Sequence, residues 1–281
     1  MLGGALVQKW TSDEIIATGS RDADIRDEGQ VRDLIVSCKP HWIVLAAAYT
    51  DVDGCERNPE LAHQVNCIGA ANVARVARET DSRLTFISTD YVFDGSKSTP
   101  YEVDDPVNPI SVYGRSKADG ENAVRKIIPD CCIVRTSWLF GAGRKCFPDS
   151  ILALAQNHKE LQVVADQRGC PTFNRDAAQA IIRLIHADAR GTINATNAGE
   201  CSRFEFAQEI LRAAGLASVV VKPATSNEQR RPAPRPKFSA LSDASLKRYG
   251  ISMRPWQEAL HDYLAERLGR AHGKEMPATH Y

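Results

Sequence analysis

The chain has 281 residues, enough for one large domain or two small ones with a sizeable core. Hydrophobic residues make up 43% and charged residues 25%, as in ordinary globular proteins. The 35 basic and 35 acidic residues balance, so no charge pattern points to nucleic acid or an anionic membrane as a partner.

The cysteines and the apolar runs set further bounds. The eight cysteines show no CxxC pair and no other spacing typical of zinc sites or disulfide frameworks. We therefore expect reduced, mostly buried thiols in a cytoplasmic protein. No apolar run approaches the roughly 20 residues of a membrane-spanning helix. The N-terminus also lacks the basic start and long apolar core of a signal peptide.

The first part of the chain predicts strands and a helix in alternation. Residues 14–18 predict a strand, and residues 42–48 predict a second, buried strand. A helix is predicted between them, from Val31 to Ser37. Alanines end the second strand, and such small residues let the backbone approach a ligand closely.

The stretch from Leu84 to Glu121 carries the clearest chemistry. It opens with a predicted buried strand that ends at Thr89, and open α/β sheets place catalytic groups at the carboxyl ends of strands. Ser111 then opens a predicted helix on which Tyr113 and Lys117, four residues apart, share one face. The ammonium is expected to lower the pKa of the phenol. The phenol would serve as a proton donor to the oxygen of a bound carbonyl group. The Thr89 hydroxyl would donate a hydrogen bond to the same oxygen.

The second half of the chain predicts further strands and helices. Strands are predicted at 132–135 and 191–195, and a loop is predicted at 225–237, which is rich in proline and arginine. The polar tail from Arg270 to Tyr281 is expected to fray. Helices are predicted at 176–186, 204–214 and 256–264.

Several segments together resemble the dTDP-4-dehydrorhamnose reductases, a family of extended short-chain dehydrogenases/reductases. The resemblance implies an α/β fold, with a Rossmann-like, doubly wound parallel sheet and a smaller C-terminal substrate-binding region. It implies an NADP-binding domain at 1–145, with 166–197 returning to it, and a substrate-binding region at 146–165 and 198–281. The matching segments are STDYVFDG, PVNPISVYGRSKADGE, RTSWLFG, AAAYTDVDGCE, DQRGCPT and RPAPRPKFSAL, and they spread over most of the chain.

The resemblance also implies a reaction. It implies an oxidoreductase of nucleotide-sugar biosynthesis that uses NADPH to reduce the 4-keto group of dTDP-4-dehydro-L-rhamnose to dTDP-L-rhamnose. Tyr113 would protonate the alkoxide, Lys117 would tune that phenol and hold the nicotinamide ribose, and Thr89 would hydrogen-bond the carbonyl oxygen. A Tyr-x-x-x-Lys pair alone also occurs by chance on solvated helix faces.

The residues that would contact the cofactor follow the predicted strands. Ser20 and Arg21 follow the strand at 14–18, and a Ser-Arg pair suits the 2′-phosphate of NADP better than the 2′-hydroxyl of NAD. NADPH is therefore expected, with NADH as the alternative. By resemblance, the other cofactor contacts are Gly3, Asp24, Ile25, Ala47, Ala48, Tyr113 and Lys117.

The glycine turn at the start of the chain is short. Relatives open with a strand and a GxxGxxG turn, which holds the dinucleotide pyrophosphate. Here only its last glycine, Gly3, is present, so the predicted sheet lacks its first strand. We expect that the start of the chain has been assigned too far downstream, or that the chain is a fragment. A degenerate cofactor site in a non-catalytic relative stays open as the alternative.

The substrate side is assigned mostly by resemblance, which places Thr50 and Asp90 next to the sugar. Trp138 would pack its indole against the sugar ring, and a tryptophan buried in the core is the alternative. Arg231 or Arg235 would bind the diphosphate through paired hydrogen bonds, and a solvated linker is the alternative there.

Two other functions stay open. Nucleotide-sugar dehydratases of this superfamily carry an acidic pair after the threonine, but Asp90 is followed here by Tyr91. Epimerases share Tyr-x-x-x-Lys and are harder to separate. A non-catalytic subunit resembling the regulatory subunit of methionine adenosyltransferase is the third possibility, and intact Thr89, Tyr113 and Lys117 argue against it.

The expected partner is a nucleotide sugar, with neither nucleic acid nor a membrane. Some relatives dimerise through a metal-bridged interface, so a homodimer and Mg²⁺ stay open. No ligands for such a metal can be placed in this sequence.

Overall fold

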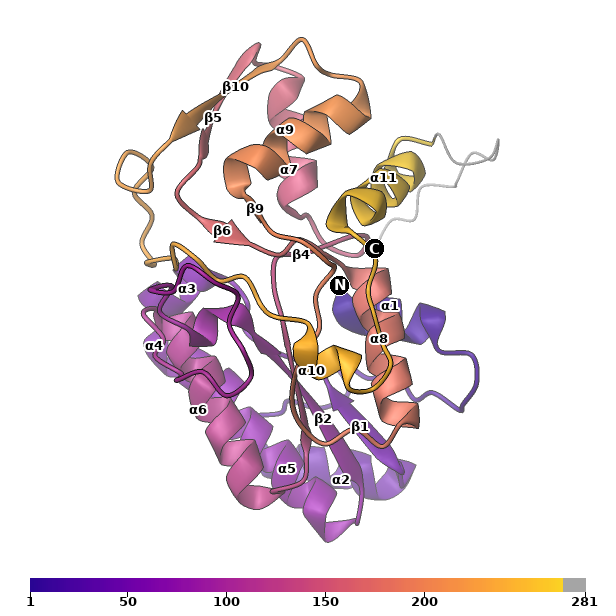
Figure 1. Ribbon diagram of the computed structural model, residues 1–281. Coiled ribbons are helices and arrows are strands. Elements are labelled where there is room, and N and C mark those ends of the chain that lie inside the picture. Colours follow the sequence, from indigo (N-terminus) through magenta and orange to yellow (C-terminus); the bar gives the residue numbers. More distant parts are fainter. Residues whose placement is uncertain (270–281) are drawn as a thin grey trace.

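The computed structural model describes residues 1–269 and has a lower part built on a parallel sheet and a smaller upper part (Figure 1). The predicted frayed tail from Arg270 to Tyr281 lies outside the described residues. The lower sheet has four parallel strands in the order β1-β2-β3-β8. Their bounds are Trp42–Leu45, Arg83–Thr89, Cys132–Thr136 and Gly191–Asn194.

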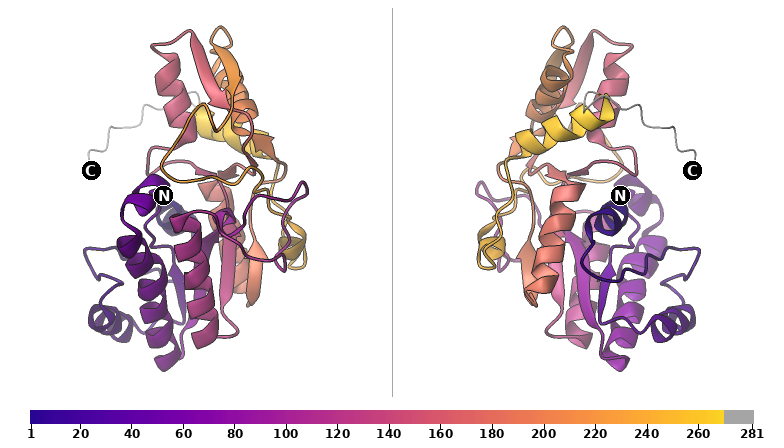
Figure 2. Two further views of the ribbon diagram at one scale, coloured as in Figure 1. Left: turned by 90° about the vertical axis from the view of Figure 1, so that its left-hand side faces the viewer. Right: turned by 90° about the vertical axis from the view of Figure 1, so that its right-hand side faces the viewer.

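Helices cover both faces of this sheet (Figure 2). Because side chains alternate along a strand, Ile87 and Val134 face α1 and α8, whereas Phe86 and Ile133 face α2, α5 and α6. This is the predicted α/β, Rossmann-like, doubly wound arrangement, and the fold class is confirmed. The helices are α1 (Leu2–Lys9), α2 (Glu28–Cys38), α5 (Gly69–Glu79), α6 (Val112–Ile127) and α8 (Asn174–His186).

Short elements line the carboxyl end of the sheet and one flank. Three of them follow β1, and a 3-10 turn follows β2 directly. A last short helix, α10, packs beside β8 and contributes Leu246 to the core that α1 and α8 share. These elements are α3 (Val52–Arg57), α4 (Pro59–His63), η1 (Gln64–Ile68, a π-helix), η2 (Asp90–Val92) and α10 (Ala244–Lys247).

The upper part has its own apolar core. Phe206 of α9 and Leu260 of α11 are fully buried there, together with Phe140. Strands β5 and β10 pair in parallel, and two shorter pairings, β4 with β7 and β6 with β9, lie where the upper part joins the sheet. The bounds are β4 (Leu139–Phe140), α7 (Phe147–Ala155), β5 (Glu160–Val164), β6 (Arg168–Gly169), β7 (Thr172–Phe173), β9 (Cys201–Ser202), α9 (Arg203–Ala214), β10 (Val220–Ala224) and α11 (Trp256–Arg267).

The strand predictions on the N-terminal side of the sheet need correction. Residues 14–18 form no strand, and Ile16 is exposed. A strand needs a hydrogen-bonded neighbour, and among residues 1–269 only β2 pairs with β1. Strand β1 is also shorter than predicted. Its outer edge pairs with no strand in the described part of the chain, and only Leu45 of this strand is buried.

The other predicted elements are present. Helices occupy the predicted positions in α2, α6, α8, α9 and α11, and residues 225–237 form an irregular loop. The helices of the described part of the chain include none that is both long and apolar enough to cross a lipid bilayer.

Candidate functional site

The start of α6 is fixed against the end of β2. Ser111 caps the helix, because its hydroxyl accepts a hydrogen bond from the Gly114 amide at 3.1 Å. A side chain at Gly114 would bring its Cβ within 2.1 Å of the Tyr91 carbonyl oxygen. Only glycine therefore lets the helix lie this close to η2, and the close approach brings Tyr113 next to Thr89.

Thr89 and Tyr113 meet at the carboxyl end of β2, as the sequence predicts. Thr89 is buried, and a hydrogen bond between its hydroxyl and the Tyr113 side chain lowers the pKa of the phenol. Burial has the larger effect and raises that pKa well above its usual value. Tyr113 therefore holds its proton at neutral pH, as a proton donor must.

Lys117 lies deeper, beneath the strand. Its ammonium donates to the carbonyl of Ile87 at 2.7 Å and lies 3.9 Å from the centroid of the Phe86 ring. Burial lowers the pKa of Lys117 to about 7, and the nearby Glu121 carboxylate opposes that change. The sequence predicted that Lys117 lowers the pKa of Tyr113. The structure corrects this prediction, because burial dominates at the phenol and the ammonium donates to a backbone carbonyl.

Asp90 is buried beside Thr89. Its carboxylate accepts a hydrogen bond from Ser239 at 2.6 Å and another from Thr89 at 3.0 Å. Burial raises the pKa of Asp90 to about 6, and the two hydrogen bonds oppose that rise. The sequence does not reveal Ser239 as a partner, because 149 residues separate it from Asp90.

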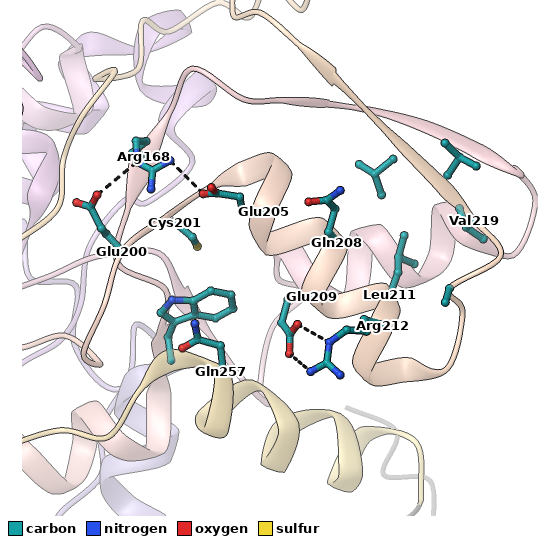
Figure 3. A pocket seen from close by; sticks show the side chains of 14 residues that line it. Arg168, Glu200, Cys201, Glu205, Gln208, Glu209, Leu211, Arg212, Val219 and Gln257 are labelled. Carbon is teal, nitrogen blue, oxygen red and sulfur yellow. Dashed lines mark hydrogen bonds and ion pairs between the residues drawn. The ribbon is translucent and has the colours of Figure 1, made fainter.

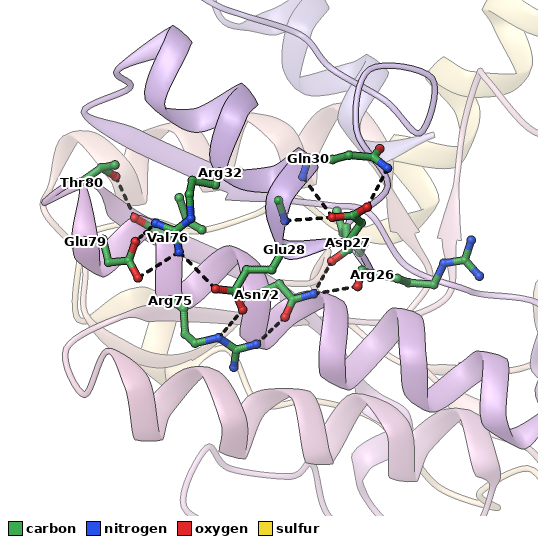
Figure 4. A network of polar contacts seen from close by, with 12 residues as sticks. Arg26, Asp27, Glu28, Gln30, Arg32, Asn72, Arg75, Val76, Glu79 and Thr80 are labelled. Carbon is green, nitrogen blue, oxygen red and sulfur yellow. Dashed lines mark hydrogen bonds and ion pairs between the residues drawn. The ribbon is translucent and has the colours of Figure 1, made fainter.

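The turn that carries Asp24 and Ile25, two of the cofactor contacts implied by the resemblance, is held against α5 (Figure 4). The Asn72 amide donates to the carbonyl of Ile25 at 2.9 Å, and the neighbouring Asp24 is ion-paired within the same turn. Ser20 and Arg21 lie just before the turn and are exposed. Exposure leaves both side chains accessible to a phosphate.

Small side chains lie at the end of β1. Gly3 of α1 faces this end, since a Cβ built on it would lie 4.0 Å from the Cβ of Ala46. Ala47 is exposed and Ala48 is partly exposed. These small side chains beside a helix start suit a bound dinucleotide, whose phosphates favour such a position.

Both predicted diphosphate ligands are ion-paired with Asp53 of α3. The buried Asp53 carboxylate lies 2.8 Å from an Arg231 nitrogen and 2.7 Å from an Arg235 nitrogen. The Ala233 amide also donates to it at 3.1 Å. The guanidiniums hold the Asp53 pKa well below its usual range. This carboxylate fixes the loop that carries both arginines, and the sequence gives no hint of it.

Trp138 follows β3 in a strained backbone conformation, with φ of 43°. Arg203 covers its ring, with Cζ 3.5 Å from the centroid, and Gly169 packs so closely that a Cβ there would lie 2.6 Å from Cε2. A sugar can therefore use only the remaining surface of the indole. Thr50 is exposed and accepts a hydrogen bond from Arg144 at 2.8 Å.

A surface groove between α9, β10 and α11 lies elsewhere (Figure 3). None of the predicted site residues lines it. Its charged side chains are paired with each other, Arg168 with Glu200 and Glu205, and Arg212 with Glu209. Within residues 1–269, no cluster of His, Cys, Asp and Glu side chains has an arrangement that would hold a metal ion.

Comparisons with known proteins agree with this geometry. A family model described as RmlD substrate binding domain matches residues 1–268. The spore coat polysaccharide biosynthesis protein SpsK of Bacillus subtilis (strain 168) is 39% identical, over 90% of this chain and 89% of its own length. A dTDP-4-dehydrorhamnose reductase of Mycolicibacterium smegmatis is 38% identical, over 94% of this chain and 82% of its own. The crystal structure of a Bacillus anthracis dTDP-4-dehydrorhamnose reductase in complex with NADP superposes with a TM-score of 0.91 and 36% identity, covering 94% of this chain and 95% of that one.

Proposed function

The chain belongs to the dTDP-4-dehydrorhamnose reductase family, and from that membership and the site we propose that it reduces the 4-keto group of dTDP-4-dehydro-L-rhamnose to dTDP-L-rhamnose with NADPH. The observation that carries the proposal is the meeting of Thr89 and Tyr113 at the carboxyl end of β2. A carbonyl oxygen bound beside these two side chains would accept from Tyr113 and, once the Thr89 hydroxyl turns from Asp90, from Thr89.

The side chains divide the work of the reaction. Thr89 and Tyr113 orient the carbonyl and polarise its C=O bond, and Tyr113 then gives its proton to the alkoxide oxygen. When bound, NADPH supplies the hydride. Lys117, one helical turn further along α6, would hold the nicotinamide ribose of the bound cofactor.

Cofactor and substrate would enter from different sides. Gly3, Ala47 and Ala48 would hold the dinucleotide, and Ser20 and Arg21 would contact its 2′-phosphate. Asp24 and Ile25 would lie on its adenine side.

On the substrate side, we assign Thr50, Asp90 and Trp138 to the sugar and Arg231 and Arg235 to the diphosphate. The NADP complex of the similar Bacillus anthracis protein supports the choice of NADPH.

The division of labour between the two parts of the chain belongs to the same proposal. Residues 1–145 and 166–197 would bind NADPH, and residues 146–165 and 198–281 would bind the nucleotide sugar. All eight cysteines are free thiols, which suits the reducing cytoplasm.

Tyr113→Phe tests the proposal. Removing the phenolic proton should lower kcat for dTDP-4-dehydro-L-rhamnose by about 10²–10⁴-fold, followed through the absorbance of NADPH. Binding of dTDP should change little, because the ring is kept. Tyr249→Phe serves as the matched control, since Tyr249 binds a backbone carbonyl on α8's side of the sheet, away from Thr89.

Two results would count against the proposal. Full activity of Tyr113→Phe would remove Tyr113 from the mechanism. A wild-type chain that binds NADPH and dTDP but does not turn over dTDP-4-dehydro-L-rhamnose would act on another nucleotide sugar.

A further inference from the structure

Arg203 lies inside the candidate site, although the sequence does not single it out. It is the first residue of α9, directly after the capping residue Ser202. Its guanidinium carbon lies 3.5 Å from the ring centroid of Trp138 and 5.0 Å from that of Phe147. Trp138 follows β3 and Phe147 opens α7, so this arginine joins three separate segments of the chain.

The charge of Arg203 has no carboxylate partner at ion-pair distance. Within residues 1–269, no carboxylate oxygen lies within 4.0 Å of its guanidinium. Its electrostatic neighbours are the side chains of Tyr91, to which it is hydrogen-bonded, Asp90 and Cys201, and it forms no ion pair with any of them. Taking a cation out of water without a counter-charge is costly, so a partly buried arginine of this kind indicates an anion from outside the chain.

The position of Arg203 relative to Tyr113 suits one part of the expected substrate. The rings of Tyr91 and Tyr113 pack edge to face, with centroids 5.7 Å apart, and Tyr91 is also an electrostatic neighbour of Arg203. In a 4-keto nucleotide sugar, the carbonyl and the diphosphate stand on opposite sides of the pyranose ring. A sugar whose carbonyl reaches Tyr113 would therefore direct its diphosphate away from that tyrosine.

We propose that Arg203 binds the diphosphate of the nucleotide sugar, an inference that rests on the proposed function. A guanidinium presents its N–H groups as a planar fork that matches phosphate oxygens. The indole of Trp138 holds that fork flat from one side. The N-terminus of α7, which begins at the neighbouring Phe147, adds its partial positive charge to the same region.

Arg203 differs in this respect from the two arginines predicted from the sequence. Arg231 and Arg235 share the carboxylate of Asp53, which neutralises part of their charge and fixes their position. Arg203 has no such neutralising partner among the described residues. It would therefore give the larger change in diphosphate affinity when it is removed.

The test compares dTDP binding by the wild-type chain, Arg203→Ala and Arg203→Lys, using calorimetry on the full-length protein. The alanine variant should bind dTDP about 10–100-fold more weakly, because a charge-assisted pair of hydrogen bonds is lost. The lysine variant should lose less, since it keeps the charge but not the fork. Raising the salt concentration should weaken dTDP binding more in the wild type than in Arg203→Ala.

Three controls separate binding from folding. NADPH affinity should stay unchanged in both variants. Thymidine, which has no phosphate, should bind the wild type and Arg203→Ala equally. Arg212→Ala removes an arginine from the same helix, but one that is paired with Glu209 on the surface, and should leave dTDP binding unchanged.

Each outcome decides a separate point. Equal dTDP affinity in the wild type and Arg203→Ala, or an equal loss for thymidine, would overturn the assignment of Arg203. If Arg203→Ala also loses NADPH binding, its fold is disturbed and Arg203→Lys is used in its place. The assignment of Arg203 is then overturned if Arg203→Lys binds dTDP as tightly as Arg212→Ala does. A wild-type chain that binds no dTDP would contradict the proposed function instead.

Discussion

Asp90 illustrates how the fold sets the charge of a single residue. Its buried carboxylate accepts hydrogen bonds from Ser239 and Thr89, yet burial raises its pKa from 3.8 to about 6. In the unfolded chain the same carboxyl ionises at lower pH. The unfolded state therefore releases its proton first, and the folded state loses stability as the pH rises through the range from 3.8 to 6.

Asp90→Asn should remove this loss of stability. The amide keeps a polar group next to both hydroxyls but cannot ionise. Relative to the wild type, the free energy of unfolding of the variant should rise by roughly 1 kcal/mol between about pH 5 and about pH 8. Urea unfolding at the two pH values measures it. Asp33→Asn, which changes an exposed carboxyl on α2, is the control. A difference that stays constant or falls with rising pH would show that Asp90 has no raised pKa.

Single residues were predictable from the sequence where their neighbours lie close along the chain. Tyr113 and Lys117 share one helix face, and Thr89 ends the preceding strand, so their spacing already indicates the site. The partner of Asp53 could not be found this way, because 182 residues separate Asp53 from Arg235. Electrostatic partners of this kind depend on tertiary packing, which local patterns do not contain.

At the level of elements, the placement of α6 depends on a glycine. A Cβ built on Gly120 would lie 2.3 Å from the carbonyl oxygen of Asn66 in η1 and 3.1 Å from the Phe86 ring. Asn66 in turn donates to the Ser116 hydroxyl of α6 at 3.0 Å. Any side chain at Gly120 would push α6 outward, and α6 carries Tyr113.

Gly120→Ala should therefore destabilise the protein by roughly 1–3 kcal/mol, since the contact is with backbone that cannot move aside. It should also lower kcat, because Tyr113 would leave its position next to Thr89.

Gly4→Ala is the matched control. Gly4 lies in helix α1 with no heavy atom within 4 Å of a built Cβ. Alanine there should stabilise the protein by about 0.5–1 kcal/mol. Urea unfolding measures both changes, and an equal effect of the two substitutions would contradict the close contact of α6 with η1.

Strands proved less predictable than helices for a physical reason. A helix satisfies its backbone hydrogen bonds within one segment, so the patterns of α2, α6, α8, α9 and α11 were sufficient. A strand depends on its neighbours. The apolar pattern at residues 14–18 is that of a strand, but the segment pairs with no strand in the described part of the chain and remains irregular.

At the scale of the whole molecule, the candidate site lies where the two parts of the structure meet (Figure 1). The lower part contributes Thr89 and Tyr113 at the carboxyl end of its sheet, and α9 of the upper part contributes Arg203. The loop at 225–237 crosses back and is fixed on α3 through Asp53. The order of these segments along the chain could be predicted from the sequence, but their meeting could not.

This arrangement predicts that the two ligands protect different segments from hydrogen exchange. NADPH should slow exchange at the end of β1 and the start of α1, because the small residues there would pack against it. dTDP should slow exchange at the starts of α7 and α9, where Phe147 and Arg203 lie. Mass spectrometry of each complex measures the effect. Residues 80–82, at the opposite end of β2, should respond to neither ligand. If both ligands protected the same segments, the site would not be divided between the two parts, since each ligand would then contact one shared surface.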